Sequence, residues 1–123
     1  MTDKQATLDD LKKKIVTFIN KRDWSQFHTP KNLSMAIATE AAELMEHFRW
    51  EKDGEDTAKL KTNRSQVEAE LADILAFVLS FAYHYQIDLS KALSKKMKIN
   101  EKRYPVKKSK GNAKKYLELW KKN

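Results

Sequence analysis

The sequence predicts an all-α fold, a helical bundle of four main helices, and two observations point to it. Only two Gly and two Pro occur in 123 residues, whereas the helix formers Ala, Leu, Lys and Glu dominate. Apolar residues also recur at helical spacing in several long segments. The length allows one hydrophobic core, so we expect a single domain over residues 1–123, with a basic tail over about residues 106–123.

The first predicted helix runs from about residue 8 to residue 20. Thr7 stands just before it, with two acids close behind, which is the pattern of a helix N-cap with acids in the first turn. The apolar residues that then recur every three or four positions, as on a buried helix face, are Leu8, Leu11, Ile15, Phe18 and Ile19.

Residues 21–30 interrupt this period and end at a proline, so we expect a loop there. Trp24, Phe27 and His28 lie in this short polar stretch. Flat side chains can enclose a nucleobase, which makes the loop a candidate for base binding. The residues are equally compatible with Trp24 and Phe27 covering the core, so both interpretations stay open.

The second predicted helix, from about residue 31 to residue 50, carries two carboxylates beside its apolar stripe. Glu40 and Glu43 are three positions apart, which makes them neighbours on one helix face, with Cβ atoms roughly 5–6 Å apart. At about 100° per residue they flank the stripe and do not oppose it, so we expect them at the rim of a cleft. The stripe consists of Leu33, Ile37, Ala41, Leu44 and Phe48.

A polar connection over residues 51–63 leads to the third predicted helix, over about residues 64–86. Glu70 and Asp73 form a second acidic pair in it, and Asp73 runs directly into the most apolar stretch of the chain. This helix is apolar nearly all round, as is typical of a helix covered on several sides. A chain of this length has difficulty covering it alone, which predicts a homo-oligomer with this helix at the interface.

The two acidic pairs together predict a metal site. Carboxylates this close repel one another unless a cation lies between them or one of them is protonated. A single Glu-x-x-Glu pair is usually a solvated surface, but carboxylates at the mouth of a buried helix cost free energy unless they are paired or bind a metal. Oxygen ligands on two facing helices suit Mg²⁺. The predicted ligands are Glu40, Glu43, Glu70 and Asp73.

The fourth predicted helix begins after a cap at Asp88 or Ser90 and ends near Arg103, before a proline. Lys96, Asn100 and Arg103 share one of its faces, a row that can bind a triphosphate or simply be solvated. The last 29 residues hold twelve Lys or Arg and two Glu, a net charge of +10, within a chain whose net charge is +8. Such a basic end favours a polyanionic partner, whereas the lysine pairs of the tail itself fit a solvated segment.

The composition also excludes several classes of protein. There is no cysteine, so no disulfide framework or thiolate chemistry is available, and a reducing compartment is expected. The first residues lack the pattern of a signal peptide, and no apolar run reaches the length of a membrane span. We therefore expect a cytoplasmic protein with no membrane partner. The three histidines lack the spacing of zinc ligands.

Four motifs, in this order, resemble the dCTP pyrophosphatase family, a group of MazG-like, all-α nucleoside triphosphate pyrophosphohydrolases. They are Trp-x-x-Phe-His-x-Pro-x-Asn-Leu from Trp24, Glu-x-x-Glu-x-x-Glu-x-Phe-x-Trp from Glu40, Glu-x-x-Asp from Glu70, and Lys-x-x-x-Asn-x-x-Arg-Tyr-Pro from Lys96. The similarity covers roughly residues 22–119. The acidic motifs mark the superfamily, whereas the first and last motifs make the closer match.

The resemblance implies a helical bundle assembled into dimers or tetramers, with the active site near a subunit interface. It implies Mg²⁺-dependent hydrolysis of deoxynucleoside triphosphates, with dCTP or modified dCTP preferred, at the α–β bond, which serves nucleotide-pool housecleaning. By position, the catalytic and Mg²⁺-binding residues would be Glu40, Glu43, Glu70 and Asp73. The substrate-binding residues would be Trp24, His28 and Trp50 for base and sugar, Lys96, Asn100 and Arg103 for phosphates, and Phe77 and Tyr104.

Two departures from the family pattern bear on substrate preference. Phe77 stands where a tyrosine is expected, so a hydroxyl contact would be missing, and Ala69 replaces a frequent acid. One alternative function is therefore a broad-specificity MazG-like pyrophosphohydrolase. Another is a non-enzymatic helical module that binds nucleic acid through the basic third. Because acids dominate the predicted cleft and no recognition helix is evident, we expect no stable nucleic-acid partner.

Overall fold

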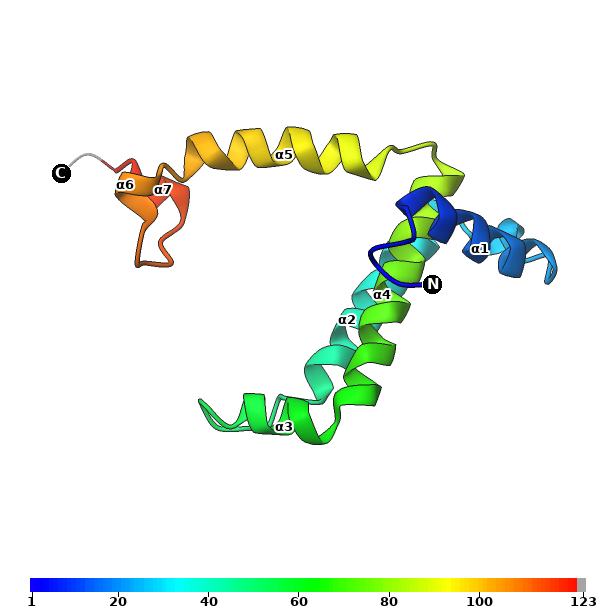
Figure 1. Cartoon of the computed structure of the whole chain (residues 1–123), viewed down its shortest axis with the longest axis horizontal. Coiled ribbons are helices and arrows are strands. Elements are labelled where there is room, and N and C mark those ends of the chain that lie inside the picture. Colours follow the sequence, from blue (N-terminus) through cyan, green and yellow to red (C-terminus); the bar gives the residue numbers. More distant parts are fainter. Residues whose placement is uncertain (122–123) are drawn as a thin grey trace. The chain divides into compact units, whose positions relative to one another are not determined.

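The computed structural model describes residues 1–121, and every regular element in that range is a helix (Figure 1). The prediction of an all-α fold is confirmed. The chain divides into two compact units, Met1–Ile87 and Asp88–Asn123. The expectation of a single domain over residues 1–123 stays a prediction, and the last two residues of the basic tail lie outside the described part.

The larger unit is built on two long helices that lie side by side, α2 (Pro30–Glu46) and α4 (Arg64–His84) (Figure 1). Helix α1 (Leu8–Asn20) and the short α3 (Asp56–Thr62) also pack against α4, and a single 3₁₀ turn, η1 (Ser25–Phe27), lies in the loop before α2. The side chains that form the buried apolar core are Val16, Ile19, Leu33, Val67, Leu79 and Ala82.

The starts of the long helices follow the sequence signals. Thr7 caps α1 by accepting a hydrogen bond from the Asp10 backbone N–H, and Asp10 accepts one in return from the Thr7 N–H, which completes a capping box. Thr29 caps α2 by accepting a hydrogen bond from the Asn32 backbone N–H, and a proline stands at the first helical position. These caps satisfy backbone donors that would otherwise lack partners.

The end of α2 differs from the prediction, which extended this helix to residue 50. The α-helix ends at Glu46, because the N–H groups of His47 and Phe48 bond to carbonyls three residues back, at 3.3 and 3.0 Å. This tightening is typical of a last helical turn. Trp50 consequently lies outside the helix, with 78% of its surface exposed, and does not share a helix face with Glu43.

Helix α4 ends at His84, two residues before the predicted end, because the next turn is left-handed. Gln86 has φ +54°. The Ile87 N–H donates to the Ala82 carbonyl at 2.8 Å, and the Gln86 N–H donates to the Tyr83 carbonyl at 3.3 Å. This pair of bonds is the Schellman motif, in which glycine normally occupies the left-handed position.

We expect Gln86→Gly to raise the free energy of unfolding by about 0.5–1 kcal/mol. A Cβ in left-handed geometry costs roughly 1–2 kcal/mol, and removing it outweighs the greater freedom of glycine in the unfolded chain. Urea unfolding measures the change. Gln86→Ala keeps the Cβ and is the control, so equal stabilities for the two variants would contradict the assignment of strain to this residue.

The smaller unit contains α5 (Leu89–Arg103), α6 (Val106–Ser109) and α7 (Tyr116–Leu119). Asp88 caps α5, as one of the two predicted candidates. The basic tail folds back on the end of α5, because the Trp120 indole N–H donates to the Arg103 carbonyl at 3.0 Å and the Arg103 guanidinium lies 4.5 Å from the centre of the Tyr116 ring. The tail is therefore structured as far as Trp120.

Within residues 1–121, no helix combines the length and the apolar character that crossing a bilayer requires. The longest helix, α4, interrupts its apolar sequence with the acidic residues of the predicted metal site.

Candidate active site

Three of the predicted carboxylates converge between α2 and α4. Glu40 and Glu43 project from successive turns of α2, and Glu70 faces them from α4. One oxygen atom from each side chain lies within 4.8 Å of the others. Below we call these three residues the acidic cluster. The structure thus brings together the two helices that the sequence analysis expected to share a metal site.

The acidic cluster carries more negative charge than its surroundings can balance. The Oε2 atom of Glu40 is buried and has no hydrogen-bond donor within reach. The pKa of Glu40 is raised, first by burial, then by the hydrogen bond that its protonated form donates to Glu43, and then by the charges of Glu43, Asp73 and Glu70. A buried carboxylate oxygen without a partner, among further carboxylates, is the environment that a hard divalent cation would satisfy.

Asp73 lies at the edge of this arrangement and is exposed. It follows Glu70 by three residues on α4, and its charge contributes to the raised pKa of Glu40. Its carboxylate is nonetheless not among the three whose oxygen atoms lie within 4.8 Å of one another. Its role as a fourth ligand stays a prediction.

His47 is a neighbour of the acidic cluster that the sequence analysis missed. Its Nε2 atom lies 3.5 Å from Oε1 of Glu70, and the two side chains are 20% and 19% exposed. The sequence analysis compared His47 only with the spacing of zinc ligands. The available signal was its position four residues after Glu43, which places both on the same helix face.

We expect Glu40→Gln to raise the melting temperature of the metal-free protein by about 2–4 °C. Like charges this close repel by about 1 kcal/mol even at the dielectric constant of water, and the amide removes that repulsion.

Since the pKa of Glu40 is raised on folding, wild-type stability should fall as pH rises from the ordinary value of 4.5 through the raised pKa. Calorimetric melts across that range check both effects; a lower melting temperature for the variant would contradict them.

The predicted base-binding aromatics lie at opposite ends of α2. Trp24 and His28 precede this helix, whereas Trp50 follows it, and 17 helical residues span about 25 Å. A single chain therefore does not bring the three side chains into one pocket. Trp24 and Phe27 are 44% and 58% exposed, and the Trp24 ring contacts Phe18 with the ring centres 5.7 Å apart, so both interpretations of the loop stay predictions.

The aromatic loop is anchored to the end of α4. The Tyr85 hydroxyl donates to the His28 carbonyl at 3.0 Å, and the rings of His28 and His84 are 5.1 Å apart. Burial, and then the charge of His84, lowers the pKa of His28. These contacts hold the loop that contains Trp24 against the end of α4.

The remaining predicted substrate residues are divided between the two units. Phe77 is half-buried on α4, four residues after Asp73. Lys96 is exposed on α5, whereas Asn100, Arg103 and Tyr104 are half-buried where that helix ends.

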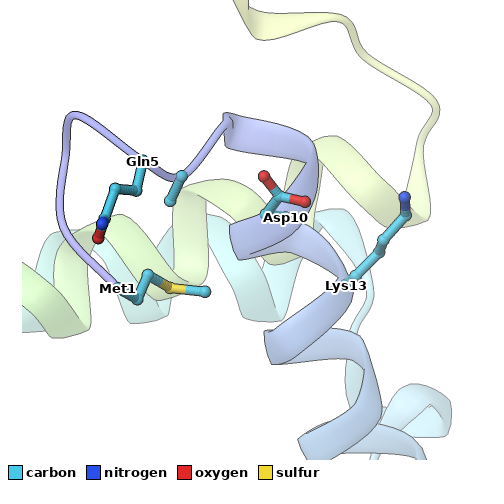
Figure 2. A pocket seen from close by; sticks show the side chains of 5 residues that line it. Met1, Gln5, Asp10 and Lys13 are labelled. Atoms are coloured by element: carbon cyan, nitrogen blue, oxygen red, sulfur yellow. The ribbon is translucent and has the colours of Figure 1, made fainter.

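The surface of the larger unit has several pockets, and not all of them are lined by the helices that carry the acidic cluster. The pocket in Figure 2, of about 370 Å³, is lined by Met1, Gln5, Asp10 and Lys13 near the N-terminus and contains none of the predicted site residues. An open apolar groove of about 590 Å³ instead shares α2 and α4 with the acidic cluster. Its lining residues are Leu44, Met45, Phe48, Arg49, Leu60, Val67 and Leu71.

Comparison with known proteins decides the family. Residues 35–119, which include every member of the acidic cluster and Asp73, match the MazG-like family. The chain belongs to the MazG-like family. The family resemblance predicted from the sequence motifs is thereby confirmed.

Individual relatives agree with this membership. The chain is 38% identical to dCTP pyrophosphatase 1 of Rattus norvegicus and 37% identical to that of Homo sapiens, in each case over 94% of this chain and 69% of the relative. A solved structure of a pyrophosphatase from Archaeoglobus fulgidus superimposes with a TM-score of 0.79 at 33% identity, over 85% of this chain and 98% of that one. The helical fold is therefore similar to that of a solved pyrophosphatase.

Proposed function

We propose that this protein is a nucleoside triphosphate pyrophosphohydrolase that cleaves deoxynucleoside triphosphates, with dCTP or a modified dCTP preferred, at the α–β bond. The observation that carries the proposal is the acidic cluster, with its unpartnered Glu40 oxygen, in a chain whose relatives are dCTP pyrophosphatases. The reaction yields a nucleoside monophosphate and pyrophosphate. Nucleotide-pool housecleaning is the role that this chemistry suits.

The acidic cluster fits Mg²⁺ as the cofactor. It offers only oxygen donors, and among the ion pairs of residues 1–121 the cluster carboxylates pair with one basic side chain, His47 beside Glu70, for three carboxylates. Glu40, Glu43 and Glu70 would hold the ion, with Asp73 as the proposed fourth ligand. When bound, Mg²⁺ supplies positive charge that offsets the charge on the phosphate oxygens during displacement.

The chain's own residues perform the remaining tasks. The Glu40–Glu43 pair orients a water molecule toward the α-phosphorus and accepts its proton as the new P–O bond forms. The bond from the α-phosphorus to the bridging oxygen breaks on the opposite side, and pyrophosphate leaves. By the family resemblance, Lys96 and Arg103 of the smaller unit would bind phosphates through charge-assisted hydrogen bonds, in a substrate held mainly by another subunit.

A homo-oligomer completes the site. Trp24 and Trp50 lie at opposite ends of α2, which spans about 25 Å, so a shared pocket needs Trp24 of one chain and Trp50 of another. Apolar side chains on α2 and α4 are exposed and support a dimer or tetramer, among them Met35, Met45, Leu71 and Leu75. The cytoplasmic location expected from the sequence belongs to the same proposal.

The test is pyrophosphate release from dCTP, 5-methyl-dCTP, dUTP and dATP with and without Mg²⁺. The proposal predicts metal-dependent release of one pyrophosphate per monophosphate, with the cytosine nucleotides preferred. Equal rates on all four nucleotides would instead favour a broad-specificity enzyme, an alternative that the phenylalanine at position 77 keeps open. No release, together with salt-sensitive retention of single- or double-stranded DNA, would replace the enzyme by the nucleic-acid-binding alternative.

A further inference from the structure

His47 lies on the side of α2 that carries the acidic cluster. Its backbone is helical, with φ −62° and ψ −23°, so the helical period of α2 continues through it. Positions 40, 43 and 47 therefore share one face. From this face the His47 Nε2 atom reaches Oε1 of Glu70 across the interface between α2 and α4, at 3.5 Å.

The geometry makes His47 a neighbour of one carboxylate and not a further ligand. The side chains whose ligand atoms lie within 4.8 Å of one another are Glu40, Glu43 and Glu70, and His47 is not among them. In the described residues 1–121, His47 is nonetheless the one basic side chain within 4.0 Å of a cluster carboxylate. Its ring packs against Phe48, with the ring centres 6.4 Å apart, which limits the orientations of the imidazole.

The contact with His47 stabilises the position of Glu70 against repulsion by the other carboxylates. Glu70 is the only member of the acidic cluster on α4, and the charges of Glu40 and Glu43 repel it toward solvent. Because His47 and Glu70 are each only about one-fifth exposed, their contact is screened less than a surface pair would be. The contact therefore opposes the repulsion and favours the orientation in which Glu70 faces its partners.

We propose that His47 is a positioning residue that holds the Glu70 carboxylate in the acidic cluster before a cation binds. The inference rests on the proposed function, because it assigns Glu70 to the metal site. A pre-oriented ligand lowers the free-energy cost of assembling the site, and partners that orient metal ligands typically contribute about 10–100-fold to metal affinity. His47 thus acts on the metal through Glu70 alone.

The test is Mn²⁺ binding, measured by electron paramagnetic resonance on the full chain without nucleotide, with all proteins at one pH. His47→Leu, which removes the imidazole nitrogens, is expected to weaken Mn²⁺ binding by about 10–100-fold. His47→Gln, whose amide can donate to the same carboxylate, is expected to recover most of the affinity. Glu68→Gln is the matched control, because Glu68 is exposed on α4 and pairs with Arg64 at 2.9 Å.

Thermal unfolding of the metal-free variants shows whether they fold. If His47→Leu does not fold, His47→Asn replaces it, because its shorter side chain keeps the polarity but not the reach, and the same loss is expected. A second readout is turnover: His47→Leu should require more Mg²⁺ for half-maximal activity, with kcat at saturating Mg²⁺ close to wild type.

The outcomes separate the two proposals. If His47→Leu and wild type bind Mn²⁺ equally while Glu70→Gln loses binding, the metal site stands and the positioning role is overturned. The positioning role is also overturned if His47→Gln binds Mn²⁺ no more tightly than His47→Leu does. If wild type itself binds no Mn²⁺, the metal site of the proposed function fails, and the positioning role fails with it.

Discussion

Glu43→Gln and Glu70→Gln are each expected to lower kcat for dCTP hydrolysis by at least about 10³-fold, which corresponds to about 4 kcal/mol of transition-state stabilisation. Each substitution keeps the size of the side chain and removes one negative charge from the acidic cluster. Asp73→Asn should also lose turnover, because the family resemblance places it among the ligands. Pyrophosphate release under saturating Mg²⁺ and nucleotide measures all three.

The control for this series is Glu68→Gln, which removes a carboxylate from the exposed side of α4 and should retain wild-type turnover. Circular dichroism should show unchanged helix content in every variant. Near-normal rates for Glu43→Gln or Glu70→Gln would contradict the assignment of these residues. A rate for Asp73→Asn within about tenfold of wild type would contradict only the assignment of Asp73 as the fourth ligand. Its position at the edge of the acidic cluster would be consistent with that result.

Trp50→Ala is expected to raise KM for dCTP by about 10–100-fold and to change kcat less. The indole is 78% exposed in the single chain, so its removal costs little stability. Stacking of a base on an aromatic side chain contributes about 1–3 kcal/mol, which is the basis of the expected change. Trp24→Ala should have a similar effect. Steady-state kinetics and urea unfolding of each variant check both statements.

Mixing the two tryptophan variants tests whether two chains share the pocket. If a pocket combines Trp24 of one chain with Trp50 of another, a heterodimer of the two variants contains one intact pocket and one that lacks both rings. Random reassembly of dimers should then restore about a quarter of wild-type activity at low dCTP. Activity that stays at the level of the separate variants would contradict a shared pocket.

The sequence predicted most helix boundaries because the signals for them are local. Thr7 and Asp88 cap α1 and α5 through bonds to residues three positions away. The tightened end of α2 and the left-handed turn at Gln86 were missed, since neither has a proline or glycine to mark it. In both places the hydrophobic period continued beyond the last α-helical residue.

The candidate site was predictable to the extent that it follows from helical spacing. Glu40 and Glu43 had to share a face, and the position of Glu70 at the start of a buried segment favoured a partner across the groove. Helical spacing places His47 on the face of Glu43, but its contact with Glu70 crosses to a second helix, so spacing alone could not identify Glu70 as its partner. The separation of Trp24 from Trp50 follows from the length of α2, which the sequence analysis had not used.

An anomalous difference map from crystals of the protein soaked in Mn²⁺ tests the central claim most directly, because it locates the ion without reference to activity. The account predicts a peak between α2 and α4, with an oxygen atom of Glu40, Glu43 and Glu70 each within about 2.0–2.6 Å of it. The same soak of Glu43→Gln crystals should weaken or abolish the peak. A wild-type map with no peak there, and with the three carboxylates turned into solvent, would contradict the account.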